Sequence, residues 1–427
     1  MEKRRVYFVI DMKSFFASVE CADRGLDAMT TKLVVADEER SEKTICLAVS
    51  PAMKALGVKN RCRLYEIPKN IDYLIAKPRM KRYIRYAAEI YGIYLKYIDK
   101  SDIHVYSIDE CIIDVTDYLK LYNLKAKEFA LLLINEILKK TGIPASAGIG
   151  SNMYLAKIAL DITAKKSPDM IGWLTEEKFI KELWHHRPIT DFWQISKGIA
   201  TRLEKHGILD MRGITECDED ILYKEFGINA ELIIDHAWGR EPCLMEDIKN
   251  YKTKSKSISA SQILPKNYNY PDALLVFKEM ILEGCYRLAR ENSTATHVNV
   301  YIGYGDDRYA GAKGSVGLFH ATNLYSEIVT RASEEFVEIV DKFRPIRKIG
   351  FSFSGVHSDT FEQVDMFTDY EKKEKEKRLT GSVLKIKDKY GKNAILRGVD
   401  FSANATQRER NMQVGGHNGG TDKDGSE

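Results

Sequence analysis

Two stretches decide the fold: VYFVIDMKSFFASVE at residues 6–20 and VYSIDECIIDVT at residues 105–116. In the first, a run of β-branched and aromatic residues ends at Asp11, which is typical of a buried strand. In the second, a strand-like run is interrupted by the pair Asp109 and Glu110, as it would be at a hairpin. The two stretches therefore predict strands that carry carboxylates at their ends.

The segments around these stretches follow an alternating order. Helices are expected where apolar residues recur every three to four positions, and strands where short apolar runs occur. The expected elements are a strand at 6–10, helices at 14–24 and 79–97, a hairpin at 103–115, a helix at 124–140, a strand at 145–149 and a helix at 152–163. When the insert at 26–78 is set aside, this is the βαββαβ order of a ferredoxin-like unit.

The three carboxylates are the candidate for chemistry. If Asp11 and the hairpin belong to one sheet, then Asp11, Asp109 and Glu110 can converge on one edge. Unpaired carboxylates held together raise each other's pKa, and divalent cations relieve that cost. Oxygen ligands with open positions for phosphate describe Mg²⁺ sites, and two such ions about 4 Å apart suit an in-line phosphoryl displacement.

The rest of the chain predicts further domains, so the fold class is α+β multidomain. Short helical segments follow residue 168, and residues 195–209 resemble a helix-hairpin-helix element. Residues 249–271 hold five lysines and no acid, which predicts an extended basic linker over 241–271. Residues 272–360 alternate as in a second α+β domain. The tail 361–427 follows, and we expect disorder from residue 404.

Composition excludes several classes of protein. Lys and Arg number 65 and Asp and Glu 62, so the net charge of +3 argues against a histone-like protein but allows a basic channel balanced by acidic surface. The seven cysteines form no C-x-x-C motif, which favours a reducing, cytoplasmic location. The longest apolar runs fall far below the roughly 20 residues of a membrane span, so no membrane association is expected.

Four blocks of the sequence carry a resemblance. They are VYFVIDMKSFFASVE (6–20), AVSPAMKALGVK (48–59), VYSIDECIIDVT (105–116) and SAGIGSNMYLAKIALDITAKK (146–166). Together they resemble the Y-family translesion DNA polymerases, in particular UmuC-like and DNA polymerase IV-like members of Gram-positive bacteria and their mobile elements. The resemblance runs from about residue 5 to 368.

The resemblance implies a ferredoxin-like palm, small fingers, a helical thumb with a helix-hairpin-helix and an α+β little finger. The implied boundaries are palm at 1–25 and 79–168, fingers at 26–78, thumb at 169–240, basic linker at 241–271, little finger at 272–360 and tail at 361–427.

The implied active site follows residue by residue. Asp11, Asp109 and Glu110 are the implied ligands of two Mg²⁺ ions, and Met12 contributes its backbone carbonyl. Phe16 matches the family's steric gate, a ring under the sugar that excludes a 2′-hydroxyl. Its neighbour Phe15 is a second nucleotide-binding candidate, although plain helix core is expected for one of the two rings.

Two lysines match the family's triphosphate contacts, Lys54 and Lys165. The sequence departs from the family nearby, because Pro51 stands where an aromatic residue is frequent and Lys54 where Arg is frequent. Lys is a point charge and lacks the bidentate fork of Arg. In the stretch over the nascent base pair, Arg61 is bulky where many relatives have small residues.

The implied contacts to primer-template DNA lie in two places. Ser196, Lys197 and Gly198, in the helix-hairpin-helix element, would offer backbone N–H groups to a phosphate, although they depart from the usual Gly-Ile-Gly. Lys252, Lys254 and Lys256 lie in the basic linker, where their charge would add a salt-dependent contribution to DNA binding.

A pentapeptide after the second domain, QVDMF at 363–367, resembles the bacterial sliding-clamp-binding motif. Gln363 is its first residue, and Met366 and Phe367 would anchor it in a hydrophobic pocket. A recombinase filament or another accessory subunit is a further candidate partner.

These features predict a template-directed, low-fidelity DNA polymerase that uses dNTPs for damage bypass. Two alternatives stay open. A nucleotidyl cyclase shares the palm-like order and paired carboxylates, but it has no use for a thumb, a basic linker or a clamp peptide. A non-catalytic clamp and DNA adaptor that kept the fold is the other, and the intact carboxylate triad argues against it.

Overall fold

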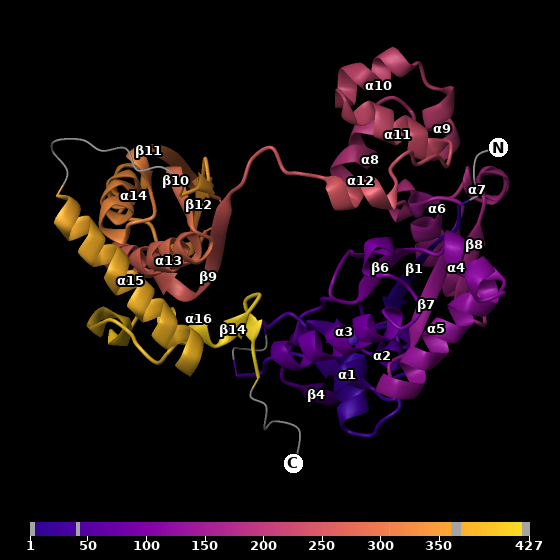
Figure 1. The fold of residues 1–427 in the computed structure, drawn as a ribbon, viewed down its shortest axis with the longest axis horizontal. Coiled ribbons are helices and arrows are strands. Elements are labelled where there is room, and N and C mark those ends of the chain that lie inside the picture. The colour runs from indigo at the N-terminus through magenta and orange to yellow at the C-terminus, as the bar shows by residue number, and fades with distance from the viewer. Residues whose placement is uncertain (1–4, 40–42, 307, 360–368, 421–427) are drawn as a thin grey trace. The chain divides into compact units, whose positions relative to one another are not determined.

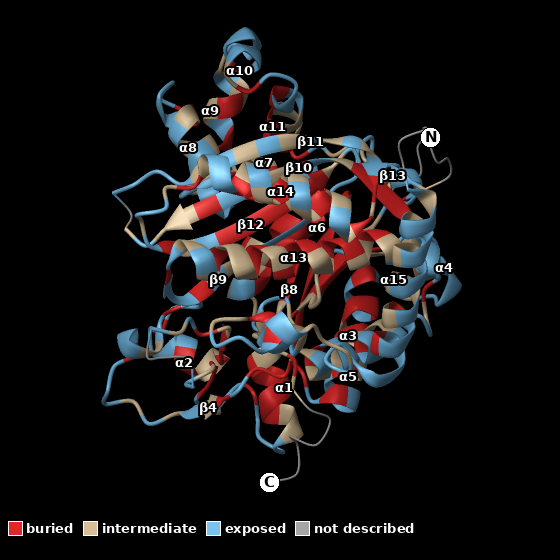
Figure 2. Ribbon diagram, turned by 90° about the vertical axis from the view of Figure 1, so that its left-hand side faces the viewer, coloured by how far each residue is buried: buried red, intermediate tan, exposed pale blue. Residues whose placement is uncertain are grey.

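The computed structural model describes residues 5–39, 43–306, 308–359 and 369–420. The chain divides into two compact units, one built on Met1–Tyr251 and the other on Lys252–Gly419. Each unit has its own buried core, shown in red in Figure 2. Among the helices within the described ranges, none combines the length and apolar character that a membrane span requires.

A five-stranded sheet organises the first unit (Figure 1). Its strand order is β5-β6-β1-β7-β8. The strands are β1 (Tyr7–Met12), β5 (Ile103–Val105), β6 (Glu110–Asp114), β7 (Ala145–Gly150) and β8 (Ile171–Leu174). The central strand β1 pairs antiparallel with both β6 and β7, and these elements follow the predicted strands and hairpin closely. The strands β5, β6, β1 and β7 lie in the predicted ferredoxin-like order. The strand β8 pairs in parallel with β7 and extends the sheet beyond it.

The two faces of this sheet carry different helices because successive side chains of a strand alternate between faces. Phe8 and Ile10 of β1 share a core with residues of α1 (Phe15–Asp23), α3 (Met80–Tyr94) and α5 (Ala126–Thr141). Tyr7 and Val9 instead pack with α6 (Met153–Ile158) and α12 (Met245–Asn250). Asp11 continues the alternation of Tyr7 and Val9, so it belongs to the α6 face.

The insert between α1 and α3 is a small subdomain with its own core. It contains β2 (Leu33–Val35), β3 (Ala48–Val49), α2 (Pro51–Ala55) and β4 (Leu74–Ala76), in the strand order β3-β2-β4. Ser50 caps α2 by accepting a hydrogen bond from the backbone N–H of Met53 at 3.4 Å, and Pro51 occupies the first turn.

Short helices complete the first unit. They are α4 (Thr116–Leu121), α7 (Glu176–Leu183), α8 (Lys197–Glu204), α9 (Met211–Glu216), α10 (Glu219–Phe226) and α11 (Asn229–Ala237). The region after residue 168 is therefore mainly helical, as predicted. It begins with β8, however, so the prediction of helices alone is wrong for these residues.

The second unit is a five-stranded antiparallel sheet in which four strands follow the order β11-β10-β12-β9 and the fifth, β13, pairs with β10. Two helices pack on this sheet. Its main elements are β9 (Ile258–Tyr268), α13 (Tyr270–Arg290), β10 (Ser293–Tyr304), β11 (Ala312–Thr322), α14 (Tyr325–Ile339) and β12 (Ile346–Ser354), with the short β13 (His357–Ser358) beside β10. The expected α+β domain is present. The extended linker predicted over 241–271 is wrong for most of its length, since α12 and β9 occupy it.

The disorder predicted from residue 404 is also wrong for the described residues. The chain after 369 forms α15 (Tyr370–Tyr390), α16 (Gln407–Asn411) and the hairpin β14 (Gln413–Val414) and β15 (His417–Asn418). The backbone N–H of Thr406 donates to the buried carboxylate of Glu279 on α13 at 3.0 Å. Hydrogen bonds between the backbone of this polar segment and buried side chains such as Glu279 hold the segment in place, although its sequence is hydrophilic.

Candidate active site

Asp11 and Glu110 meet across the centre of the first unit's sheet. They are paired in register on β1 and β6, and paired residues of neighbouring strands project to the same face. The backbone N–H of Met12 donates to the carbonyl of Asp109 at 3.0 Å, which closes the hairpin against β1. The structure therefore brings the three predicted carboxylate residues to one end of these two strands.

The electrostatics of this cluster are those of crowded carboxylates. Burial, together with the charges of Asp109 and Glu110, raises the pKa of Asp11 to about 7, against the opposing attraction of Lys157. Burial also raises the pKa of Glu110, and Lys157 again opposes the shift. Holding these groups ionised together requires a compensating positive charge.

Lys157 on α6 supplies part of that charge. Its Nζ lies 2.8 Å from Oε1 of Glu110, donates to Oε2 at 2.9 Å, and donates to Asp161 at 3.2 Å. The side chains of Lys157 and Glu110 are each 9% exposed. Lys157 is not among the residues predicted from the sequence. The one local signal was its spacing of four residues from Asp161, which is typical of a helical ion pair.

The carboxylates are not arranged as a ready-made metal site. Asp109 accepts a hydrogen bond from the hydroxyl of Ser107 at 2.7 Å, and Glu110 is engaged by Lys157. Within the described ranges, no three His, Cys, Asp or Glu side chains are placed to hold an ion as they stand. The donor set nevertheless fits a hard divalent cation, because Asp11, Asp109 and Glu110 all offer carboxylate oxygens at one end of the paired strands.

The two phenylalanines at the start of α1 have different environments. Phe15 is 2% exposed and belongs to the core, so the structure gives it the structural role that was expected for one of the rings. Phe16 is half-buried and packs against Tyr83 of α3, with ring centroids 4.7 Å apart. Phe16 therefore keeps an accessible side and is the better placed of the two to meet a nucleotide.

Three lysines gather near Asp11. Partial burial lowers the pKa of Lys54, and the neighbouring charges of Lys165 and Lys13 lower it further, while Asp11 opposes the shift. Lys54 comes from α2 and Lys165 from the 3₁₀ segment Ala164–Lys166, and both side chains keep part of their surface accessible to solvent. Lys13, which the sequence analysis did not single out, directly follows Asp11 and Met12. Cations beside the carboxylates suit a ligand that carries both a metal ion and phosphates.

The structure also places three further residues that were singled out in the sequence. Pro51 lies in the first turn of α2, and Met12 lies at the end of β1 with a buried side chain. Arg61 is exposed in the insert and has a left-handed backbone conformation, with φ of 59°. Its bulk is therefore at the surface of the subdomain and not in its core.

The candidate DNA contacts near residue 196 lie at the start of a helix. The Ser196 hydroxyl accepts a hydrogen bond from the backbone N–H of Ile199 at 3.4 Å, and Lys197 and Gly198 form the first turn of α8. The glycine turn of this element is at Gly207, with φ of 75°, between α8 and α9. The helix before Ser196 is only the three-residue 3₁₀ segment Ile189–Asp191, shorter than the helix-hairpin-helix pattern predicts.

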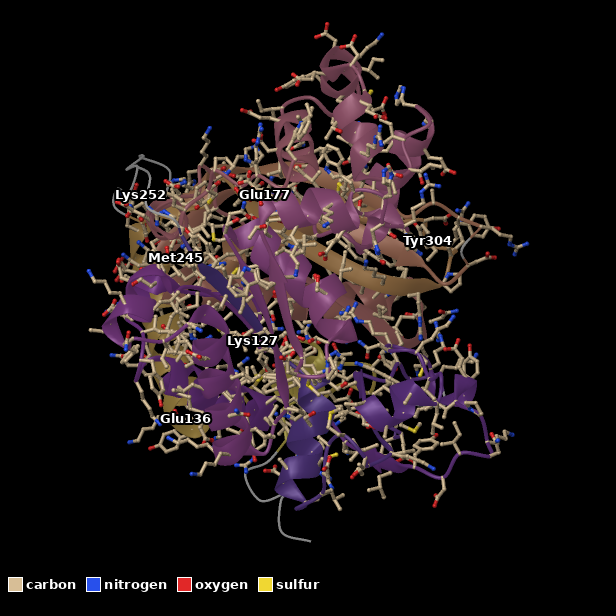
Figure 3. The ribbon with its side chains drawn as sticks, turned by 90° about the vertical axis from the view of Figure 1, so that its right-hand side faces the viewer. Lys127, Glu136, Glu177, Met245, Lys252 and Tyr304 are labelled. Atoms are coloured by element: carbon tan, nitrogen blue, oxygen red, sulfur yellow. The ribbon has the colours of Figure 1, made fainter. Side chains whose placement is uncertain are left out.

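The other candidate contacts are placed as follows. Lys252, Lys254 and Lys256 are exposed in the non-regular segment before β9, and Lys252 is labelled in Figure 3. Lys256 forms an ion pair with Glu291 at 2.9 Å. The pentapeptide with Gln363, Met366 and Phe367 lies outside the described residues.

Comparisons with known proteins agree with this architecture. Residues 10–161 match the impB/mucB/samB family, and residues 255–366 match the C-terminal domain of that family. DNA polymerase IV 2 of Bacillus subtilis (strain 168) is 31% identical over 98% of this chain and 100% of its own length. DNA polymerase IV 2 of Halalkalibacterium halodurans is 29% identical over 97% of this chain and 99% of its own length.

A solved structure, a Y-family DNA polymerase chimera, superposes with a TM-score of 0.63 at 22% identity, covering 83% of this chain and 99% of the chimera. Palm, thumb and little-finger domains on this plan, with clustered carboxylates at the centre of the palm, define a Y-family DNA polymerase. The chain belongs to the impB/mucB/samB family of such polymerases. The resemblance and the fold class inferred from the sequence are thereby confirmed. The family implies DNA and nucleotide substrates and a general dependence on divalent metal ions.

Proposed function

We propose that this polymerase copies damaged DNA with low fidelity, by nucleotidyl transfer with two Mg²⁺ ions. The observation that carries the proposal is the register pairing of Asp11 with Glu110, with Asp109 held beside them and three lysines nearby. When bound, the ions would neutralise the carboxylates and stabilise the charge that develops during phosphoryl transfer. Asp11, Asp109, Glu110 and the backbone carbonyl of Met12 would hold them.

Side chains of this protein would bind the triphosphate, lie beside the primer terminus and select the sugar. Lys54 and Lys165, assisted by Lys13, would bind the triphosphate and orient its reacting phosphate. Glu110 would sit beside the attacking 3′-oxygen of the primer. The exposed side of Phe16 would lie under the sugar and exclude a 2′-hydroxyl by steric overlap. The buried position of Phe15 argues against a direct nucleotide contact.

The DNA would be gripped outside the palm. The first-turn amides of α8, at Lys197 and Gly198, would bind a backbone phosphate beside Ser196. Lys252 and Lys254 would add sequence-independent attraction, and Lys256 would do so on release from Glu291. The peptide with Gln363, Met366 and Phe367 would bind the bacterial sliding clamp, and an accessory subunit or recombinase filament would act on the same complex.

Primer extension on matched undamaged and abasic templates tests this function. We expect extension on both templates with Mg²⁺ and none with EDTA. Extension on the undamaged template alone would contradict the bypass proposal. DNA binding without extension, even with added sliding clamp, would instead favour an adaptor.

A further inference from the structure

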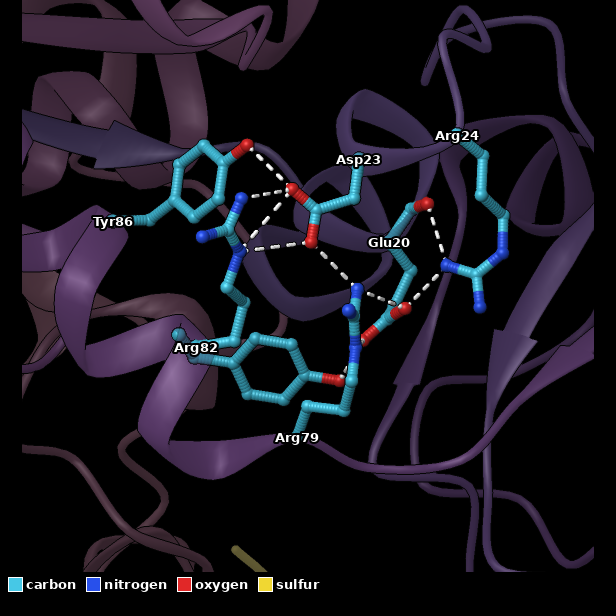
Figure 4. A network of polar contacts seen from close by, with 7 residues as sticks. Glu20, Asp23, Arg24, Arg79, Arg82 and Tyr86 are labelled. Carbon is cyan, nitrogen blue, oxygen red and sulfur yellow. Dashed lines mark hydrogen bonds and ion pairs between the residues drawn. The ribbon is translucent and has the colours of Figure 1, made fainter. Parts of the chain in front are cut away.

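A buried polar network joins α1 to the start of α3 (Figure 4). The guanidinium of Arg79 donates to both carboxylate oxygens of Glu20, at 2.9 and 2.8 Å, and to Asp23 at 2.7 Å. Arg82 donates to Asp23 from the next turn of α3, with its shortest distance 2.6 Å. The insert at 26–78 starts just after Asp23 and ends just before Arg79, so the network fixes both ends of the fingers subdomain.

Glu20 is the centre of this network and is fully buried. A buried carboxylate is costly unless it is paired and hydrogen-bonded. Arg79, whose side chain is 8% exposed, provides a bidentate partner, and Arg24 contributes a second ion pair from α1. The remaining partner of Glu20 is Tyr83, whose hydroxyl donates to Oε1 at 2.7 Å.

Tyr83 connects this network to the candidate nucleotide site. Its ring is fully buried and its hydroxyl is fixed by Glu20, so it has no freedom to rotate away. The ring of Tyr83 packs against the ring of Phe16, with an angle of 33° between the two ring planes. Phe16 also touches Phe15, at a centroid distance of 5.6 Å, but Phe15 is core and carries no polar anchor.

We propose that the hydrogen bond from Tyr83 to Glu20, held in place by Arg79, positions the Phe16 ring and so sets how strongly the enzyme rejects ribonucleotides. Glu20, Arg79 and Tyr83 are positioning residues here, since none of them is required to touch the nucleotide. The inference rests on the proposed gate function of Phe16.

The physical reason is the steepness of steric repulsion. A gate that works by overlap with one hydroxyl loses most of its selectivity if the ring can retreat by a few tenths of an ångström. Interior packing resists such movement only where the supporting side chain is itself fixed. A free tyrosine ring would support Phe16 less firmly than one tied to a buried ion pair.

The test compares Tyr83→Phe with Tyr86→Phe. Both variants remove one hydroxyl from the same network, because Tyr86 donates to Asp23 at 2.8 Å. Of these two tyrosines, Tyr83 is the one whose ring packs on Phe16. The readout is the ratio of kcat/KM for dNTP to that for rNTP in primer extension. For Tyr83→Phe we expect the ratio to fall about three- to tenfold, as for one lost buried hydrogen bond, with kcat/KM for dNTP nearly unchanged. Tyr86→Phe should keep the wild-type ratio.

Two further variants test whether the effect of Tyr83→Phe acts through Phe16 and whether it depends on Arg79. In a Phe16→Ala background, Tyr83→Phe should have no additional effect on the ratio. Arg79→Lys, which keeps the charge but loses the fork, should lower the ratio in the same direction and serves if Tyr83→Phe does not fold.

Three results would overturn the inference. If Phe16→Ala abolishes discrimination and Tyr83→Phe and Arg79→Lys do not lower it, the gate stands and the positioning role fails. If Tyr86→Phe lowers the ratio as much as Tyr83→Phe, the effect is general loosening of the network. If Phe16→Ala itself leaves the ratio unchanged, the proposed gate fails and the inference fails with it.

Discussion

Asp11 and Glu110 are register partners on the antiparallel strands β1 and β6, and both project to the face of the palm sheet that α6 covers. Lys157 of α6 reaches Glu110 at 2.8 Å on that face. The strand pairing fixes the spacing of the two carboxylates through the backbone, and the helix supplies the charge that keeps Glu110 paired without an ion. The catalytic proposal depends on this arrangement.

Replacement of Lys157 by Met should destabilise the protein in a metal-dependent way. Breaking a buried ion pair costs roughly 3–5 kcal/mol, and we expect a loss of unfolding free energy of that order in EDTA. Saturating Mg²⁺ should restore part of it, because the ion would take over the charge of the ammonium. Denaturant unfolding with and without Mg²⁺ measures both values.

Lys96→Met is the matched control for Lys157. Lys96 forms an ion pair with Glu136 at 2.8 Å, but its side chain is 43% exposed. Such pairs contribute about 0–1 kcal/mol, and no dependence on Mg²⁺ is expected. An equal deficit of Lys157→Met in EDTA and in Mg²⁺ would contradict the view that the lysine stands in for a cation.

Truncation of the two phenylalanines should have opposite consequences. Phe15→Ala removes a core ring, so a loss of roughly 3–5 kcal/mol of stability is expected with little change in sugar selection. Phe16→Ala should cost less stability and should admit ribonucleotides. Thermal unfolding together with single-nucleotide insertion distinguishes the two variants, and loss of sugar selection in Phe15→Ala but not in Phe16→Ala would reverse the assignment.

The triphosphate-binding role predicts a change in KM. Lys54→Met and Lys165→Met should each raise the KM for dNTP about tenfold or more, as expected for a lost charge-assisted contact. Lys59, an exposed lysine after α2, provides the control, and Lys59→Met should leave KM unchanged. Steady-state insertion kinetics with a single dNTP measure these values. An unchanged KM for both Lys54→Met and Lys165→Met would remove them from the site.

The network at Asp23 predicts a dependence of stability on pH. Burial opposes ionisation of Asp23, but hydrogen bonds from Arg82 and Tyr86 and the charge of Arg79 outweigh it and lower the pKa of this carboxyl. Because the pKa of Asp23 is lower in the folded state than in the unfolded state, ionised Asp23 stabilises the fold at any pH above its unfolded-state pKa, which is near 4. This stabilisation is lost as the pH falls through the pKa of the folded state.

Asp23→Asn should therefore be less stable than the wild type at pH 7, and the difference should shrink below about pH 4. Urea unfolding at a series of pH values measures it. A difference that stays constant down to pH 3 would show that the contribution of Asp23 does not depend on its charge.

The central palm could be predicted from the sequence because its strands are short apolar runs buried on both faces. β8 was missed because the four residues of Ile171–Leu174 include a glycine and an exposed tryptophan, and their strand state depends on parallel pairing with β7. The sequence predicts a linker in place of β9 because β9 is an edge strand with one solvated face and contains Lys266 and Pro265.

The residues of the candidate site also fall into those that the sequence predicts and those that it does not. The carboxylates could be predicted because Asp11 ends a strand and Asp109 and Glu110 interrupt a hairpin, so the chain itself brings them together. Lys157 and Lys13 could not, because a single lysine carries no signal until the tertiary structure places it beside the carboxylates. The same holds for Glu20, which looks like an ordinary helix residue in sequence and is fully buried in the fold.

The most direct test of the central claim is Mg²⁺-dependent primer extension by Asp109→Ala beside the wild type and Asp99→Ala. Asp99 is an exposed carboxylate away from the cluster, so its variant should extend primers like the wild type. We predict that Asp109→Ala loses extension and still binds primer-template DNA within a few-fold of the wild type. Extension by Asp109→Ala at a rate comparable to the wild type would contradict the assignment of the carboxylates as the metal-binding catalytic site.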